Sequence, residues 1–319
     1  MKKYFVMLAA ALLCLALCGC GVSKEEVVNK IFEEKADSFH SLMDLEMDMT
    51  MGMGGMSLDL SVGGTMNLDF DGRDKDNPSM HMTMNLSTSA MGQKNVQNME
   101  SYIVTEDGQP KNYMTSTTNA GRWVLSTNDA ATGSKMDEAT RQKFLDELKN
   151  VLMTADLEKD TQNIGSEECY VLKMDTDGSV LNGVVEVLWD ALDASARAEM
   201  RNAGTDLVDI KSILPYIKIK ASIYTSKENG KIMQTDLDLS GTDTVGLLQK
   251  AAGAAGAAAA SMGVNLSAVK MDFNKFDLSF RMSDYNNVTV TVPDEVRESA
   301  EGGAGDEEED EAEEEEYVE

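Results

Sequence analysis

The sequence predicts an α+β fold, with antiparallel strands on either side of a helical middle segment. Three observations support this. The capping-box pattern Ser23-x-x-Glu26 is followed by apolar residues at helical spacing, which predicts a helix to about Asp37. From Leu42 onward, apolar and polar residues alternate with a period of two, as in strands with one solvated face. Helical periodicity then occupies the middle of the chain before strands resume.

The first half of the chain is predicted to form a meander of short strands. Alternation covers residues 42–53, 56–62, 65–71 and 79–89, and three further strands cover 100–105, 111–117 and 122–126. Turn residues separate them, namely Gly54-Gly55, Gly63-Gly64, the Asp-rich run 71–74, Asp107-Gly108 and 119–121.

The second half is predicted to mix helices with strands. A helix is expected over 137–153, a strand over 169–175 and one long helix over 178–202. Strands 216–225 and 232–239 form a hairpin through an Asn-Gly turn. An Ala-rich helix over 243–262 is either a packed crossover or a lid, and strands 269–282 and 288–292 follow.

The N-terminus has the pattern of a lipoprotein leader. Residues 1–19 combine two lysines with a short apolar run, which is too short for a bilayer-spanning helix of about 20 apolar residues. The stretch Leu17-Cys18-Gly19-Cys20 resembles the bacterial lipobox. By that resemblance Cys20 becomes the acylated N-terminus, Cys18 is the weaker alternative, and residues 20–23 are a short linker. A diacyl or triacyl anchor then holds the chain stably in a membrane.

The remaining cysteine and the charge exclude several function classes. Cys169 would be the sole thiol of the mature chain, so it can form neither an internal disulfide nor a CxxC metal site, and its strand-like surroundings predict a buried apolar role. Residues 301–319 hold twelve acidic residues and no basic one, which predicts a disordered acidic tail over 299–319. The body, 24–298, is acidic as well. This charge balance argues strongly against nucleic acid as a partner. We also expect a monomer.

The order of elements resembles the LolA/LppX/LprG superfamily, and more closely the uncharacterised surface lipoproteins of Gram-positive bacteria that share its fold. Two stretches support the resemblance, ESYIVTEDGQPKNYMTSTTNAGRWVLST and KASIYTSKENGKIMQTDLDLSG, within a match over Lys24–Glu295. The resemblance implies a strongly curved antiparallel sheet, an incomplete barrel, wrapped around helices. It also implies an apolar hollow that holds acyl chains, and no catalysis. The Met-rich first strands, the Ala-rich helix and the acidic tail depart from the superfamily pattern.

The candidate binding residues are methionines. In LEMDMTMGMGGM, residues two apart share one face of a strand and lie about 6.6 Å apart. SMHMTMNL repeats the pattern, and its His81 is expected on the opposite face. The predicted ligand-binding set is Met47, Met49, Met51, Met66, Met80, Met82 and Met84, with Tyr102, Tyr113 and Trp123 at the rim.

Three interpretations of these methionines remain open. In the first, they fill a packed core, because thioethers adapt to irregular gaps. In the second, they line a hollow that holds a ligand. In the third, they bind Cu(I), because soft sulfur ligands select soft metal ions. No other metal or cofactor is expected. The chain lacks G-x-S-x-G, H-E-x-x-H, Walker and Rossmann patterns, and has two histidines, His40 and His81, so the sequence predicts no enzyme.

The resulting hypothesis is a lipoprotein on the outer leaflet of a cell membrane that binds a lipid or another apolar molecule. The alternatives are an envelope scaffold with a packed core and, third, an extracytoplasmic copper-binding protein.

Overall fold

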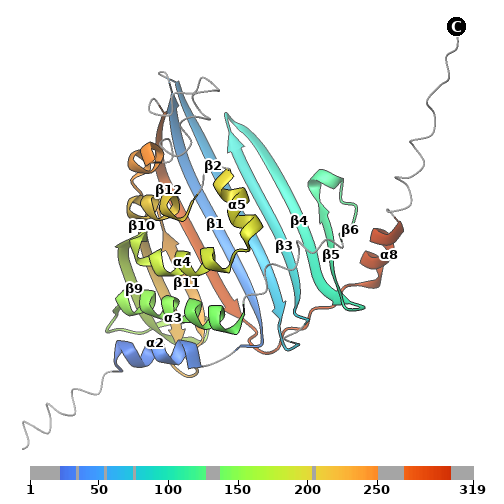
Figure 1. Cartoon of the computed structure of the whole chain (residues 1–319), viewed down its shortest axis with the longest axis horizontal. Helices are drawn as coiled ribbons and strands as arrows, with labels where there is room; N and C mark the ends of the chain where they lie inside the picture. The colour runs from blue at the N-terminus through green and yellow to red at the C-terminus, as the bar shows by residue number, and fades with distance from the viewer. Residues whose placement is uncertain are drawn as a thin grey trace, which may run out of the picture.

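The structure is a computed structural model that describes residues 22–33, 36–53, 56–74, 77–126, 137–202, 206–250 and 269–302. Twelve strands form one antiparallel sheet in the order β6-β5-β4-β3-β2-β1-β12-β11-β10-β9-β7, with β8 paired to β9. The sheet is curled and open, because its end strands β6 and β7 are not paired with each other (Figure 1). The predicted α+β class and curved open sheet are confirmed.

Long strands form the first half of the sheet, as the alternating pattern predicts. These are β1 (Ser38–Met53), β2 (Met56–Asp71), β3 (Ser79–Ala90), β4 (Gln93–Glu106), β5 (Gln109–Ser116) and β6 (Val124–Ser126). The turn at Asp107 and Gly108 has φ of 54° and 73°. Both values lie in the left-handed region that a tight hairpin requires.

The second half adds β7 (Asp156–Leu157), β8 (Gln162–Ile164), β9 (Glu167–Asp177), β10 (Lys218–Ser226), β11 (Ile232–Asp238) and β12 (Val269–Ser283). The helices are α2 (Lys24–Glu33), α3 (Glu138–Thr154), α4 (Asn182–Ala191), α5 (Ala194–Asn202), α6 (Leu207–Ile213) and α8 (Asp294–Gly302). A further helix starts at Thr244.

Three element predictions need correction, and the first concerns Gly63-Gly64. The pair lies inside the continuous strand β2, opposite Glu46 and Leu45 of β1, and does not form a turn. A Cβ atom on Gly64 would lie 2.6 Å from the carbonyl oxygen of Asn85 on β3. Glycine is therefore present because the β2 and β3 backbones approach closely here.

The predicted helix 178–202 is interrupted. α4 ends at Ala191, and Leu192 has an extended backbone with ψ of 140°. Asp193 then accepts the backbone N–H of Ala196 through Oδ1 at 2.7 Å, which makes it the N-cap of α5. The aspartate thus starts a new helix at a position where periodicity alone predicts continuation.

Residues 288–292, predicted as a strand, form no ladder in the described chain. This C-terminal strap crosses the sheet and is held by side chains (Figure 1). Ser38 Oγ accepts the N–H of Val288 at 3.2 Å, and Arg73 donates to the carbonyl of Val288 at 2.9 Å. The strap leads into α8. The predicted domain ends at residue 298, whereas α8 continues to Gly302.

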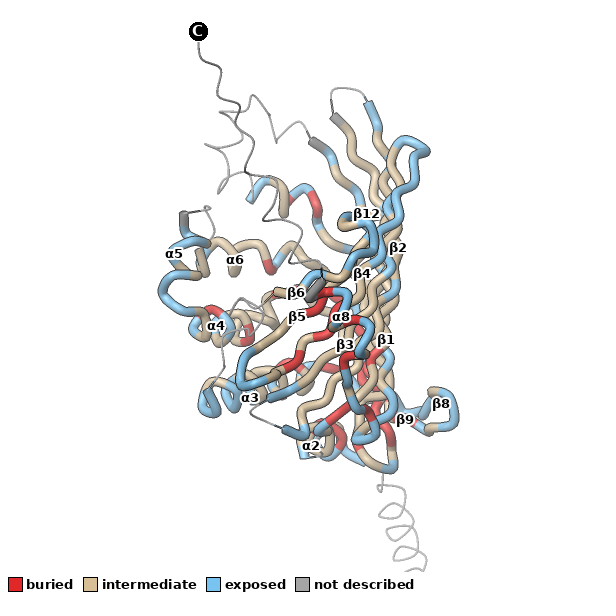
Figure 2. The backbone as a smooth tube through the Cα atoms, turned by 90° about the vertical axis from the view of Figure 1, so that its right-hand side faces the viewer, coloured by how far each residue is buried: buried red, intermediate tan, exposed pale blue. Residues whose placement is uncertain are grey.

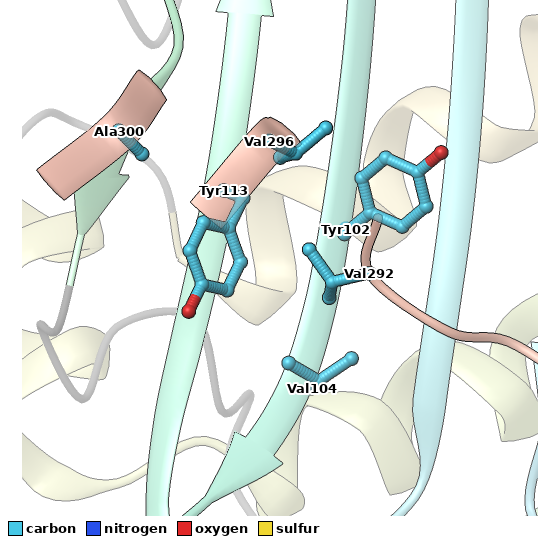
Figure 3. Close-up of a cluster of buried hydrophobic side chains, with 6 residues drawn as sticks. All are labelled: Tyr102, Val104, Tyr113, Val292, Val296 and Ala300. Atoms are coloured by element: carbon cyan, nitrogen blue, oxygen red, sulfur yellow. The ribbon is translucent and has the colours of Figure 1, made fainter. Parts of the chain in front are cut away.

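Two hydrophobic cores lie on opposite faces of the sheet. The side that carries α2 to α6 is called the inner face, and the other side the outer face (Figure 2). On the inner face, Val27 and Val28 of α2 pack with Ala155, Leu172 and Ile223. On the outer face, α8 and the strap cover a second core of Tyr102, Val104, Tyr113, Val292, Val296 and Ala300 (Figure 3).

Several predictions lie outside the described residues. They are the leader 1–19, Cys20, the turn at Gly54-Gly55, most of the Ala-rich helix 243–262, and residues 303–319 of the acidic tail.

Candidate functional site

The predicted methionines share the inner face. Strand pairing places directly opposite residues on the same side of a sheet. One cross-strand row runs Met43–Met66–Met84–Met99 through β1, β2, β3 and β4. The next row joins Leu45 to Leu278, Leu237, Ala221 and Met174, and Met174 packs against the inner core.

The rest of the predicted set follows from the same register. Met82 lies opposite Leu68, and Met80 lies opposite Phe70. On β1, residues Met47, Met49 and Met51 face Val62, Leu60 and Leu58 of β2. Register thus brings together all seven predicted methionines. The methionine face is defined here as Met43, Met47, Met49, Met51, Met66, Met80, Met82, Met84 and Met99.

β12 extends this face with aromatic rings. A bulge opposite Asp48 and Met49 leaves Asn274 unpaired in the ladder, so that Phe273 and Phe276 both lie opposite inner-face methionines. Their ring centroids are 5.5 Å apart in an edge-to-face arrangement, which aromatic pairs prefer. The apolar surface therefore continues across β12 toward the inner core.

The methionine face is half-buried along its whole length. None of its nine residues belongs to either hydrophobic core or packs directly against one. From Met43 to Met51 the strand rises about 26 Å, and the row from Met43 to Met99 crosses about 14 Å of sheet. One leaflet of acyl chains is about 15 Å thick, so the face is large enough for such a chain.

Sequence reasoning missed Met43 and Met99. Met43 lies within the predicted strand 42–53 and in the same alternation as Met47, but it precedes the stretch LEMDMTMGMGGM, which starts at Leu45. Met99 comes just before the predicted strand 100–105, whereas β4 starts at Gln93. Applying the period-two pattern to the whole predicted strand 42–53, and extending the strand 100–105 toward its N-terminal side, would have included both residues.

The aromatic residues predicted at the rim lie elsewhere. Tyr102 and Tyr113 pair with each other on the outer face and are 8% and 0% exposed. Trp123 packs against the same outer core, with its ring 5.9 Å from that of Tyr102. The structure therefore separates these three residues from the methionine face by the thickness of the sheet, because the register of β4 turns Tyr102 outward.

A carboxylate joins the outer core to α8. Glu106 accepts hydrogen bonds from the Tyr113 hydroxyl at 2.8 Å and from Arg297 Nη2 at 2.8 Å, and Lys111 Nζ lies 3.0 Å away. Burial raises the pKa of Glu106, but these donors outweigh it and lower the pKa to about 2. Burial, with the nearby Glu100 carboxylate, raises the pKa of Tyr102 to about 12.

Both histidines lie on the outer face. The side chain of His81 therefore points to the side of the sheet opposite Met80 and Met82, as predicted. His40 Nδ1 lies 2.7 Å from Asp69, and His81 bridges Asp69 at 3.4 Å and Glu100 at 3.0 Å. Among the described residues no group of three or more His, Cys, Asp or Glu could hold a metal ion.

Cys169 is a fully buried free thiol of β9. Its Sγ lies 3.6 Å from the carbonyl oxygen of Glu167, and burial raises the pKa of the thiol. A thiol held in the protonated form is a poor nucleophile. These features agree with the predicted role as a small apolar residue.

Two hollows lie on the outer face. One, of about 560 Å³, is lined by five aspartates and two lysines of β7 and β9 to β12, including Asp236, Asp238 and Lys220. The other, of about 490 Å³, spans β2 to β5 and is lined mainly by Asn and Thr side chains. The sequence offered no signal for either, because their residues are the ordinary polar positions of alternating strands.

Residues 23–252 match the model of DUF6612, a family of unknown function. The chain belongs to this family. No curated protein matches it. Among the described helices none is long and apolar enough to cross a membrane.

The matched solved structures are distant. LprF from Mycobacterium bovis is 7% identical, with 85% of this chain and 95% of that chain covered and a TM-score of 0.35. A LolA superfamily protein from Nitrosomonas europaea is 11% identical, with 86% and 97% covered and a TM-score of 0.17. The MucA/MucB complex of Pseudomonas aeruginosa is 8% identical, with 86% of this chain and 60% of that chain covered and a TM-score of 0.26. Scores this low transfer no ligand or activity.

Proposed function

We propose that this chain is a lipoprotein, anchored through Cys20 on the extracytoplasmic side of a cell membrane, that binds a lipid or another apolar molecule without catalysis. The observation that supports it best is the half-buried methionine face, an apolar surface on the helix side of the sheet that belongs to neither core.

Burial of apolar surface would drive binding. Each methylene removed from water contributes about 0.8 kcal/mol, and nine flexible thioether side chains can adapt to acyl chains of different shapes. The face carries no ionised group in its methionine rows, so nothing there holds a charged substrate. A role in binding fits this surface better than a role in catalysis.

The first test is native mass spectrometry of residues 21–319, followed by organic extraction. We expect an adduct of several hundred daltons that extracts as lipid. Met49→Glu and Met82→Glu should each remove it, because a carboxylate on the inner face disfavours an acyl chain. Met91→Glu is the matched control, since Met91 is 84% exposed in the β3–β4 turn.

Circular dichroism and thermal unfolding show whether each variant is folded. A folded wild-type protein with a bare mass, also after incubation with membrane-lipid vesicles, would contradict lipid binding and favour a scaffold with a packed interior. In cells, Cys20→Ser should release the protein from the membrane fraction. Retention of that variant in the membrane would contradict the lipid anchor.

Copper binding is a second candidate, favoured by the row Met43–Met66–Met84–Met99. Adjacent strands are about 4.8 Å apart, which brings the thioethers of this row close together. Met66→Leu together with Met84→Leu distinguishes the candidates. Leucine keeps the apolar surface but removes sulfur ligands, so only Cu(I) binding should be lost.

A further inference from the structure

We infer that the hollow across β2 to β5 on the outer face is a binding site for an uncharged oligosaccharide. It lies on the side of the sheet opposite the methionine face and goes beyond the proposed lipid function. Its volume of about 490 Å³ falls within the 300–1,000 Å³ typical of ligand sites.

The floor of the hollow consists of two cross-strand rows of polar side chains. One row joins Thr65, Asn85 and Asn98, and the neighbouring row joins Asn67, Thr83 and Glu100. Five of these six side chains are uncharged and carry an amide or a hydroxyl. Such groups both donate and accept hydrogen bonds, as sugar hydroxyls do.

The side chains of the floor are held by bonds to one another. Asn85 Nδ2 donates to Asn98 Oδ1 at 2.5 Å, and Asn67 Nδ2 donates to Thr83 Oγ1 at 3.2 Å. These bonds leave the Asn98 amide N–H groups and the Asn67 and Asn85 amide oxygens with capacity for a ligand. Because the residues lie on strands within a sheet, the array is positioned before a ligand arrives.

The single carboxylate is also fixed. Glu100 Oε1 lies 3.0 Å from His81 Nε2 and accepts the Tyr102 hydroxyl at 3.2 Å. Glu100 also lines the hollow. A hydrogen bond from a sugar hydroxyl to a carboxylate is charge-assisted and therefore stronger than one to a neutral acceptor.

Charge selects against other ligand classes. No lysine or arginine of the described residues lines the hollow, and the chain has a net charge of −28, so phosphates and other anions are repelled. The side chains of its two cross-strand rows are polar, which disfavours an acyl chain. A neutral polyhydroxylated ligand matches both features.

The test is ligand-observed NMR of residues 21–319 with four uncharged probes: maltotetraose, cellotetraose, xylotetraose and chitotetraose. We expect binding of at least one with a Kd of about 1 mM or tighter. Asn85→Thr and Asn98→Thr should weaken it at least about tenfold, because threonine suits a strand but cannot make the amide pair. Asn95→Thr, an exposed position of β4 outside the hollow, is the matched control and should bind as the wild type does.

Two results would overturn the site: binding of none of the four probes at about 10 mM, or binding that the Asn85 and Asn98 variants leave unchanged. The test is independent of the lipid proposal. Met82→Glu should leave oligosaccharide binding intact, and Asn98→Thr should leave the lipid adduct intact, since the two sites lie on opposite faces.

Discussion

At the scale of single residues, Glu106 is a carboxylate whose pKa is lowered by the hydrogen-bond donors around it. It joins β4, β5 and α8 through Tyr113, Lys111 and Arg297. Its pKa of about 2 lies below the ordinary 4.5, so its folded carboxylate is stabilised relative to the unfolded chain. That contribution is fully present above about pH 4.5 and is lost as pH falls toward 2.

Glu106→Gln should therefore lower the free energy of unfolding by about 1–3 kcal/mol at pH 7. The difference from wild type should shrink between about pH 4.5 and pH 2, because protonation removes the same ion pairs from the wild-type protein. Urea unfolding at several pH values measures it. Glu298→Gln, at an exposed position of α8, is the control, and a pH-independent difference would contradict the assignment.

At the scale of elements, close packing of β2 against β3 depends on one glycine. A Cβ on Gly64 would lie 2.6 Å from the Asn85 carbonyl and 3.1 Å from the Leu86 side chain. Its neighbour Gly63 has its nearest such contact at 3.8 Å, from the Leu45 carbonyl. The two glycines therefore form a matched pair with different steric surroundings.

Gly64→Ala should destabilise the fold by about 1–3 kcal/mol, because backbone must shift to make room. Gly63→Ala should lower the free energy of unfolding by no more than about 0.5 kcal/mol. This position has room for a methyl group, and alanine also restricts the unfolded chain, which favours the folded state. Chemical denaturation of both variants measures the difference. Equal stabilities would mean that β2 and β3 are not in close contact at this point.

At the scale of the whole molecule, the C-terminal strap and α8 complete the outer core. Val296 and Ala300 of α8 cover Tyr113, which has no exposed surface (Figure 3). A fully buried valine contributes about 1.5–3 kcal/mol, and the Arg297–Glu106 pair adds to that. The chain beyond β12 is thus part of the fold as far as α8.

Removal of residues 294–319 should lower the melting temperature and shift Trp123 fluorescence toward the emission of exposed indole. Removal of only 303–319 keeps α8 and should leave both properties unchanged, which makes it the control. Thermal scans followed by tryptophan emission measure the two truncations. An unchanged melting temperature after loss of α8 would show that the outer core does not need this helix.

The interpretation of local patterns succeeded where the pattern is itself the cause of the structure. Alternation predicted the shared face of Met47, Met49 and Met51, because successive side chains of any strand point to opposite sides. It failed at Gly63-Gly64, since a glycine pair serves both turns and close approaches of backbones. It also missed the interruption at Asp193, where a single capping residue outweighs helical periodicity.

The sequence by itself determined the α+β class, the run of antiparallel strands and a common side for the methionines, because residue period and turn chemistry act within a few residues. Only the tertiary structure decided which side of the sheet each strand turns toward the helices. That choice depends on pairing between distant strands, such as β1 with β12, and on α8 covering Tyr102 and Tyr113. A one-residue change of register exchanges the two faces, so the assignment of a residue to the inner or outer face is a property of the assembled sheet.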